Sequence, residues 1–349
     1  MDQESFQKFE NLCNAVFGNV GNGSTPEARS MLESICLSPD FVEKSELGLW
    51  FVLTNRTIFE NSKNIYALHV TGTSLIKVMT DYWNNYDIDQ KLRIRDFVLE
   101  YLIKNGINLP KHVTTTLCTL ICRITSLSWM IDTRQRDILD KMQKFTESPE
   151  NCVLALKILD ELVNEINPQK KSTVQQNKTA LNFRDTNLFN ILKLAVDMLS
   201  KSLITDDATM GSPDLRYQLY DASLQLFTRC CSFDSKVSAG EELWEIHPTL
   251  NLPEKWMRDV LQNKTFELLF NVYNQCVDPL TTTTLDALLW LLYAPRADLY
   301  AAETSEDIFG TIMKGLTGIL SSKHGLDNPD TIHSFVQIVD RFKVRVELW

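Results

Sequence analysis

The sequence predicts an all-α protein in which helical hairpins stack into a solenoid, a right-handed α-α superhelix. Glycine and proline are scarce, with 12 and 11 among 349 residues, against an average usage of about 12% for the pair. β-Sandwiches, barrels and doubly wound nucleotide folds need more of these turn-forming residues. Apolar residues recur with the helical period over nearly the whole chain. The first helices of the predicted pairs begin at residues 3, 40, 89 and 131, close to the spacing of roughly 40–47 residues in HEAT and armadillo repeats.

The first half of the chain divides into four predicted helix pairs. Around 89–105, apolar residues recur at the positions expected for one helix face, and Arg93, Arg95, Asp96 and Glu100 lie mostly off that face, toward solvent. Ser-Pro-acid openings at 38–40 and 148–150 supply an N-cap, a proline in the first turn and an acid near the positive helix end. The four predicted pairs are 3–17 with 26–37, 40–55 with 62–81, 89–105 with 109–128, and 131–146 with 149–166.

The second half contains helical patterns separated by polar stretches. Residues 167–182 include Pro168, three lysines and a run rich in Gln, Asn, Ser and Thr, which predicts a polar loop or linker. Solenoid ends normally carry a polar capping repeat, and none follows Arg345, so we expect the array to be truncated there. The predicted organisation is helical repeats at 1–166, the connection at 167–182 and further repeats at 183–349. The later helices are expected at 186–202, 215–231, 254–276, 280–293, 306–321 and 329–348.

Charge and composition exclude several classes of function. The chain has 35 basic and 45 acidic residues, and no basic run that could track a phosphate backbone, so we expect no nucleic-acid partner. The longest strongly apolar stretch, 285–293, is too short to span a bilayer, which predicts no membrane insertion. The N-terminus lacks the features of a secretory signal, and the eight scattered cysteines are typical of reduced thiols in an intracellular protein.

No arrangement of residues typical of catalysis, cofactor binding or metal binding stands out. The glycines at 18–25 lack both the lysine and the preceding strand of a phosphate-binding loop. Cys118 and Cys122 share one helix face, but His112 is the single further donor nearby and a zinc site needs four. The acid pair at 206–207 has no third acid at the spacing of an aspartate-rich magnesium motif. We therefore predict no catalytic, cofactor-binding or metal-binding residues, and a protein that is not an enzyme.

Three groups of residues between 28 and 106 occur in a fixed order that resembles the importin N-terminal domain of the importin-β (karyopherin) superfamily. They are Ala28-x3-Leu32 with Ser38-Pro39-Asp40, Tyr66-x8-Leu75-x-Lys77, and Gln90-Lys91-x-Arg93-Ile94-Arg95-x-Phe97. Further along, Arg123-Ile124-Thr125-x-Leu127-x-Trp129, Phe183-Arg184-Asp185 and Pro253-x2-Trp256 are similar to the exportin-7 class, which includes Ran-binding proteins 16 and 17. Members of that class are several times longer, so the resemblance is to an N-terminal portion. The chain departs from many members at Thr71-Gly72, where they carry two alanines, and this glycine weakens the helix by up to about 1 kcal/mol.

The resemblance implies a nuclear transport receptor that binds Ran-GTP, exports proteins through the nuclear pore and shuttles between nucleus and cytoplasm. The second helices at 26–37, 62–81 and 109–128 would then meet Ran, and Glu33, Lys77 and Arg123 are candidate contacts. Phe-Gly repeat proteins of the pore would bind grooves on the first-helix side. Protein cargo would need the repeats that this portion lacks.

Two alternatives use the same sequence features differently. A HEAT or armadillo scaffold would hold protein partners on the same surfaces without Ran. An all-α metal-dependent enzyme would require zinc or magnesium, which the scattered histidines and cysteines do not favour.

Overall fold

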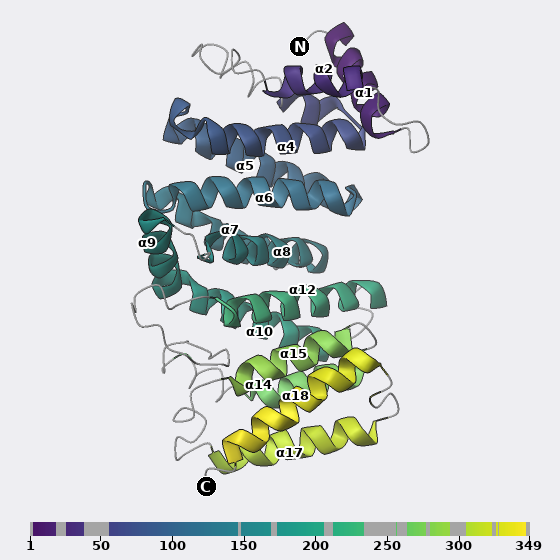
Figure 1. Ribbon diagram of the computed structural model, residues 1–349, viewed down its shortest axis with the longest axis vertical. Coiled ribbons are helices and arrows are strands. Elements are labelled where there is room, and N and C mark those ends of the chain that lie inside the picture. The colour runs from purple at the N-terminus through teal and green to yellow at the C-terminus, as the bar shows by residue number, and fades with distance from the viewer. Residues whose placement is uncertain are drawn as a thin grey trace. The chain divides into compact units, whose positions relative to one another are not determined.

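The computed structural model describes residues 3–18, 26–37, 56–145, 148–168, 173–205, 212–233, 256, 264–276, 280–293, 305–322, 326 and 328–346. Every regular element in these ranges is a helix, so the predicted all-α helical-repeat fold is confirmed (Figure 1). No described helix combines the length and the apolar character needed to cross a membrane. The expected helix at 40–55 and the acid pair at 206–207 lie outside the described residues.

The chain divides into two units, Met1–Lys141 and Met142–Trp349. Helix α7 (Ile138–Phe145) crosses this division. Unit 1 contains α1 (Gln3–Phe17), α2 (Pro26–Leu37), α4 (Ile65–Asp81), α5 (Ile88–Asn105) and α6 (Lys111–Ser128). The short 3₁₀ helices η2 (Trp83–Asn85), η3 (Gly106–Asn108) and η4 (Thr133–Asp137) lie in the connections.

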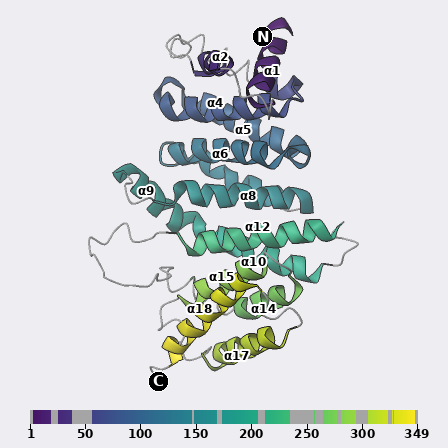
Figure 2. The ribbon, with the colours of Figure 1, turned by 45° about the vertical axis from the view of Figure 1, so that its right-hand side comes forward.

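The second helices of the hairpins form one layer in unit 1. Helix α2 packs on α4 and α4 packs on α6, while α1 packs on α2 and α5 packs on α6. Figures 1 and 2 both show α4 and α6 side by side. Capping residues mark the starts of α4 and α5. Asn64 accepts hydrogen bonds from the N–H groups of Tyr66 and Ala67 at the start of α4, and Asp87 forms a capping box with Gln90 at the start of α5.

Gly72 of α4 lies against the Thr116 and Leu117 side chains of α6. A Cβ atom built on Gly72 would lie 2.9 Å from Cγ2 of Thr116 and 3.2 Å from Cδ2 of Leu117. A side chain at this position would therefore have to displace the Thr116 and Leu117 side chains. The close approach gives a packing reason for a glycine that lowers the intrinsic stability of α4.

Arg95 is fully buried, which corrects the expectation that it faces solvent. Its Nη1 donates to the backbone oxygen and to Oε1 of Gln135, at 3.2 and 2.9 Å, and its Nη2 donates to Asp96 and Asp137, at 2.7 and 2.9 Å. Lys141 pairs with the same two carboxylates at 2.9 and 3.0 Å. The helical period predicts that this face of α5 is polar and exposed, but η4 covers it. The guanidinium group of Arg95 therefore donates its hydrogen bonds to protein acceptors in place of water.

Unit 2 also consists of two helical layers. One is formed by α8 (Pro149–Ile166), α12 (Pro213–Cys231), α15 (Leu280–Leu292) and α18 (Pro329–Val346), each of which packs on the next. The other is formed by α10 (Phe189–Ile204), α14 (Thr265–Gln275) and α17 (Ser305–Ser321), stacked in that order. Helix α12 also packs on α10, and α15 packs on α14, which closes each hairpin.

The polar stretch expected as a loop at 167–182 contains a helix, α9 (Val174–Phe183). Thr173 and Gln176 form a capping box at its start, and its chain runs on through a π-helical turn, η5 (Arg184–Leu188), into α10. The expectation of a loop is wrong for residues 174–182, because the capping box starts a helix there and the chain continues as helix into η5 and α10. The division of the chain into repeats before and after this stretch stays a prediction.

Candidate functional site

The three residues singled out as Ran contacts lie on the second-helix layer of unit 1. Glu33 is exposed on α2, Lys77 is exposed on α4 and Arg123 is partly buried on α6. A Cβ atom built on Gly72 would meet Thr116 and Leu117, so residue 72 of α4 lies opposite residues 116 and 117 of α6. Lys77 lies five residues after Gly72 and Arg123 lies six after Leu117, so the structure brings these two cations to a similar level of adjoining helices.

The open sides of α4 and α6, which we call the α4–α6 face, are cationic in a chain of net charge −10. The two helices carry Lys77, Lys111 and Arg123 against one acid, Asp81. Several threonines also lie on this face, but their hydroxyl groups donate to carbonyl oxygens four residues earlier: Thr73, Thr80 and Thr115. These hydroxyl groups therefore use their hydrogen within their own helix and can offer a partner only their oxygen lone pairs.

Two histidines that the sequence interpretation did not assign to any site meet on this face. The rings of His69 and His112 pack edge to face with centroids 5.4 Å apart, and Thr116 Oγ1 lies 3.1 Å from His69 Nδ1. Burial lowers the pKa of His69, and the neighbouring His112 lowers it further. A separation of 43 residues, about one repeat, places them on adjoining second helices, and this spacing is the signal that could have found the pair.

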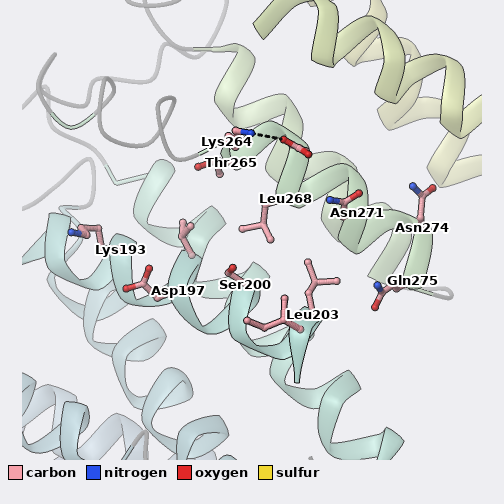
Figure 3. Close-up of a pocket in the computed structure, with 13 residues that line it drawn as sticks. Lys193, Asp197, Ser200, Leu203, Lys264, Thr265, Leu268, Asn271, Asn274 and Gln275 are labelled. Atoms are coloured by element: carbon pink, nitrogen blue, oxygen red, sulfur yellow. Dashed lines mark ion pairs between the residues drawn. The ribbon is translucent and has the colours of Figure 1, made fainter. Parts of the chain in front are cut away.

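A groove of about 770 Å³ lies between α10 and α14 in the first-helix layer of unit 2 (Figure 3). Leu203 of α10 and Leu268 of α14 line it, and Ile204, 81% exposed, lies on its α10 side. Polar side chains surround these apolar groups: Lys193, Asp197, Ser200, Lys264, Glu267, Asn271, Asn274 and Gln275. Such a groove suits an apolar side chain whose adjoining peptide groups meet amides and charges.

The rim of this groove has an unusual backbone. Lys264 precedes α14 with φ 54° and ψ 36°, the left-handed region, and its Nζ lies 3.8 Å from Glu267 Oε2. Gln275 at the other end accepts a hydrogen bond of 3.0 Å from the Tyr220 hydroxyl group. No sequence motif marks the groove, since its two walls come from helices about 70 residues apart in the chain.

The cysteines singled out in the sequence are buried thiols in the described structure. Cys118 and Cys122 are buried on α6, and no group of three or more metal-ligating side chains occurs among the residues that the structure describes. Burial raises the pKa of Cys230 well above its ordinary value, and that of Cys231 is also raised by burial. Gly18 follows α1, whereas the rest of the glycine loop lies outside the described residues.

The chain is similar to known proteins along nearly all of its length. No family model matches the chain. The chain is 27% identical over 357 residues to Exportin-7-B from Xenopus laevis, 26% identical over 352 residues to Ran-binding protein 17 from Mus musculus, and 23% identical over 352 residues to Ran-binding protein 16 from Drosophila melanogaster. These alignments cover 98–99% of this chain but 31% of each relative. The predicted similarity to the exportin-7 class is therefore confirmed, and the coverage is consistent with an N-terminal portion of such a protein.

Proposed function

We propose that this chain is part of a Ran-dependent nuclear transport receptor of the exportin type. The observation that carries the proposal is similarity along 98–99% of the chain to proteins named exportin-7 and Ran-binding proteins 16 and 17. A repeat fold of paired helices suits such a role, because it displays a broad binding surface rather than a closed active site. In this proposal the receptor moves between nucleus and cytoplasm, and cargo binding belongs to the longer protein.

The α4–α6 face is the proposed Ran contact, with Lys77 and Arg123 as its principal charges and Glu33 on the adjoining α2. Its excess of positive charge favours an acidic surface on the partner. Lys77 is exposed and would act mainly on the rate of association, whereas the partly buried Arg123 would form the more persistent contact.

The decisive experiment compares binding of purified chain to Ran locked in its GTP form and in its GDP form. Binding restricted to the GTP form is the expected result. Replacing both Lys77 and Arg123 with Glu should weaken that binding at least about tenfold, because close charge pairs at protein interfaces couple by about 1.5 kcal/mol or more. Lys104→Glu is the matched control, since Lys104 is exposed in the same unit but lies on α5, in the other layer.

Two outcomes would contradict the proposal. Equal binding of both nucleotide forms would favour a repeat scaffold that does not depend on Ran. Absence of binding by a chain with the expected helical circular dichroism would exclude Ran binding by these repeats.

We also propose the α10–α14 groove as the position for the Phe-Gly repeats of pore proteins. Support comes from its place between two first helices and from the apolar side chains of Leu203 and Leu268 in its lining. Binding of a fluorescent Phe-Gly repeat peptide should be lost in Leu268→Glu. It should persist in Val174→Glu, which changes a 72% exposed residue on α9. Unchanged binding in Leu268→Glu would remove the groove from the proposal.

A further inference from the structure

Two histidines from adjoining helices lie together on the α4–α6 face. His69 belongs to α4 and His112 to α6, and their rings are 5.4 Å apart between centroids, with ring planes inclined by 72°. His69 is partly buried, whereas His112 is exposed. Imidazole is a ligand that suits zinc, copper and nickel ions. Two imidazole rings at this distance are therefore a candidate pair of metal ligands.

The distance between the two rings fits a metal chelate. A zinc ion lies about 2.0–2.1 Å from a ligating imidazole nitrogen, which places it about 3.2 Å from the centre of that ring. Two imidazoles that bind one tetrahedral zinc ion therefore have ring centres about 5.2 Å apart. The observed centroid separation of 5.4 Å is close to this value. Because His112 is exposed, its ring has room to turn a nitrogen toward the ion.

Thr116 determines which nitrogen of His69 is available to a metal. Its Oγ1 donates its one hydrogen to the backbone oxygen of His112, at 2.9 Å, and lies 3.1 Å from Nδ1 of His69. Since the hydroxyl hydrogen is already used, the oxygen accepts from His69, whose Nδ1 carries the proton. The lone pair of the neutral ring is then on Nε2. Metal-binding histidines are typically oriented in this way, by donating their other N–H to a protein acceptor.

The local charges have opposing effects on a metal ion. Burial and the neighbouring His112 lower the pKa of His69, which favours the neutral ring that a metal requires. Lys111 precedes His112 in the first turn of α6, and both its charge and the positive end of the helix repel a cation. We therefore expect weaker binding than in a closed site with four protein ligands.

We propose that His69 and His112 form a two-histidine zinc site that joins α4 to α6, with Nε2 of His69 as one ligand. Water fills the positions that the protein leaves free in open zinc sites, and it would complete the coordination here. The sequence interpretation expected no metal-binding residues because it searched for ligands within one segment, whereas these two come from different helices. This inference does not depend on Ran binding.

Binding of zinc chloride to the purified chain, measured by isothermal titration calorimetry at neutral pH, tests the proposal. We expect a site whose affinity falls at least about tenfold in His69→Ala and in His112→Ala, since loss of even an outer-shell partner costs about 10–100-fold in metal affinity. His333→Ala is the matched control, because His333 is an exposed histidine on α18, and it should keep the original affinity.

A second measurement identifies the histidines directly. Diethyl pyrocarbonate modifies accessible imidazole nitrogens, and mass spectrometry reads each histidine peptide separately. Zinc chloride should slow the modification of His112 by at least about tenfold, because a metal-bound nitrogen has no free lone pair. The modification of His333 should keep its rate. Equal rates at His112 with and without zinc would overturn the proposal.

Two further outcomes would also overturn it. One is the absence of zinc binding by the folded chain. The other is unchanged zinc affinity in His112→Ala, a variant that removes an exposed side chain and should keep its helical circular dichroism. Thr116→Val removes the acceptor for Nδ1 of His69 and should lower the affinity about tenfold. Unchanged affinity in this variant would contradict the assignment of Nε2 as the ligand.

Discussion

Two glycines of α17 offer a sharp test of how the helical layers of unit 2 pack. Gly315 lies against the ring of Phe270 on α14, and a Cβ atom at Gly315 would overlap that ring. Apart from its own helix, no described residue comes within 4 Å of a Cβ atom built on Gly318. Substitution with alanine therefore makes the same chemical change in the same helix, with and without a packed neighbour.

The magnitude follows from two opposing effects. Alanine in place of glycine favours a helix interior by about 0.5–1 kcal/mol, and Gly318→Ala should gain that amount in unfolding free energy. Gly315→Ala gains the same amount but must displace the buried Phe270, and overpacking of this kind costs about 1–3 kcal/mol. The gain in helix propensity is common to both variants. The two changes in unfolding free energy should therefore differ by about 1–3 kcal/mol, which measures the cost of displacing Phe270 at the contact of α14 with α17.

Urea unfolding followed by circular dichroism, with amide hydrogen exchange of α14 and α17, provides the measurement. Exchange is needed because repeat arrays need not unfold in one step. We expect slower exchange in α17 of Gly318→Ala and faster exchange in both α14 and α17 of Gly315→Ala. Equal stabilisation by the two substitutions would refute the reasoning, since it would mean that Gly315 has room for a side chain.

Four further predictions concern two arginines, a histidine and two buried thiols. Arg95→Ala should lower the unfolding free energy by about 2–5 kcal/mol, because two buried acceptors of Gln135 lose their donor. Arg134→Ala, which removes exposed ion pairs, should leave urea unfolding nearly unchanged. The pKa of His69 is lowered in the folded state, so the unfolded state binds more protons in the window just below the ordinary histidine value of about 6.5. Thermal stability should therefore fall as pH falls through that window, and His69→Gln should reduce the fall; an unchanged slope would contradict this. Burial raises the pKa of Cys152 to about 11 and that of Cys276 to about 12. Both should resist alkylation at pH 8 until the chain unfolds, and rapid labelling in the native state would be inconsistent with their burial.

Helix positions were the most predictable feature of this protein. The predicted helices at 3–17, 26–37 and 149–166 coincide with α1, α2 and α8. The last of these begins with Ser148, whose side chain accepts a hydrogen bond from the Asn151 N–H, and with proline in its first turn. Apolar period and capping residues act within one helix, so the sequence contains the information needed to place it.

Helix α9 shows where that reasoning is incomplete. Its ten residues lack a strong apolar stripe, so period alone indicates a loop. The Thr173 and Gln176 capping box was the available sign of a helix start.

The candidate sites depended less on local sequence. Lys77 was placed on an open helix face by its pattern and by family resemblance, and the structure bears out its exposure. The groove between α10 and α14 has walls from two repeats, and no short motif could predict it. Its width depends on how the two helices pack, which is a property of side chains far apart in the chain.

The sequence by itself determined that this protein is an array of helical hairpins, because apolar period, scarce turn residues and repeat spacing are all local or periodic properties. Only the tertiary structure decided what each polar or small residue does within that array. Arg95 has the pattern of a solvent-facing residue, yet η4 buries it and supplies acceptors from about 40 residues away. Gly72 weakens its helix in isolation, yet its missing side chain lets α4 and α6 approach closely. In both cases the physical reason is the same: burial is set by the neighbouring repeat, and a helix does not encode its neighbour.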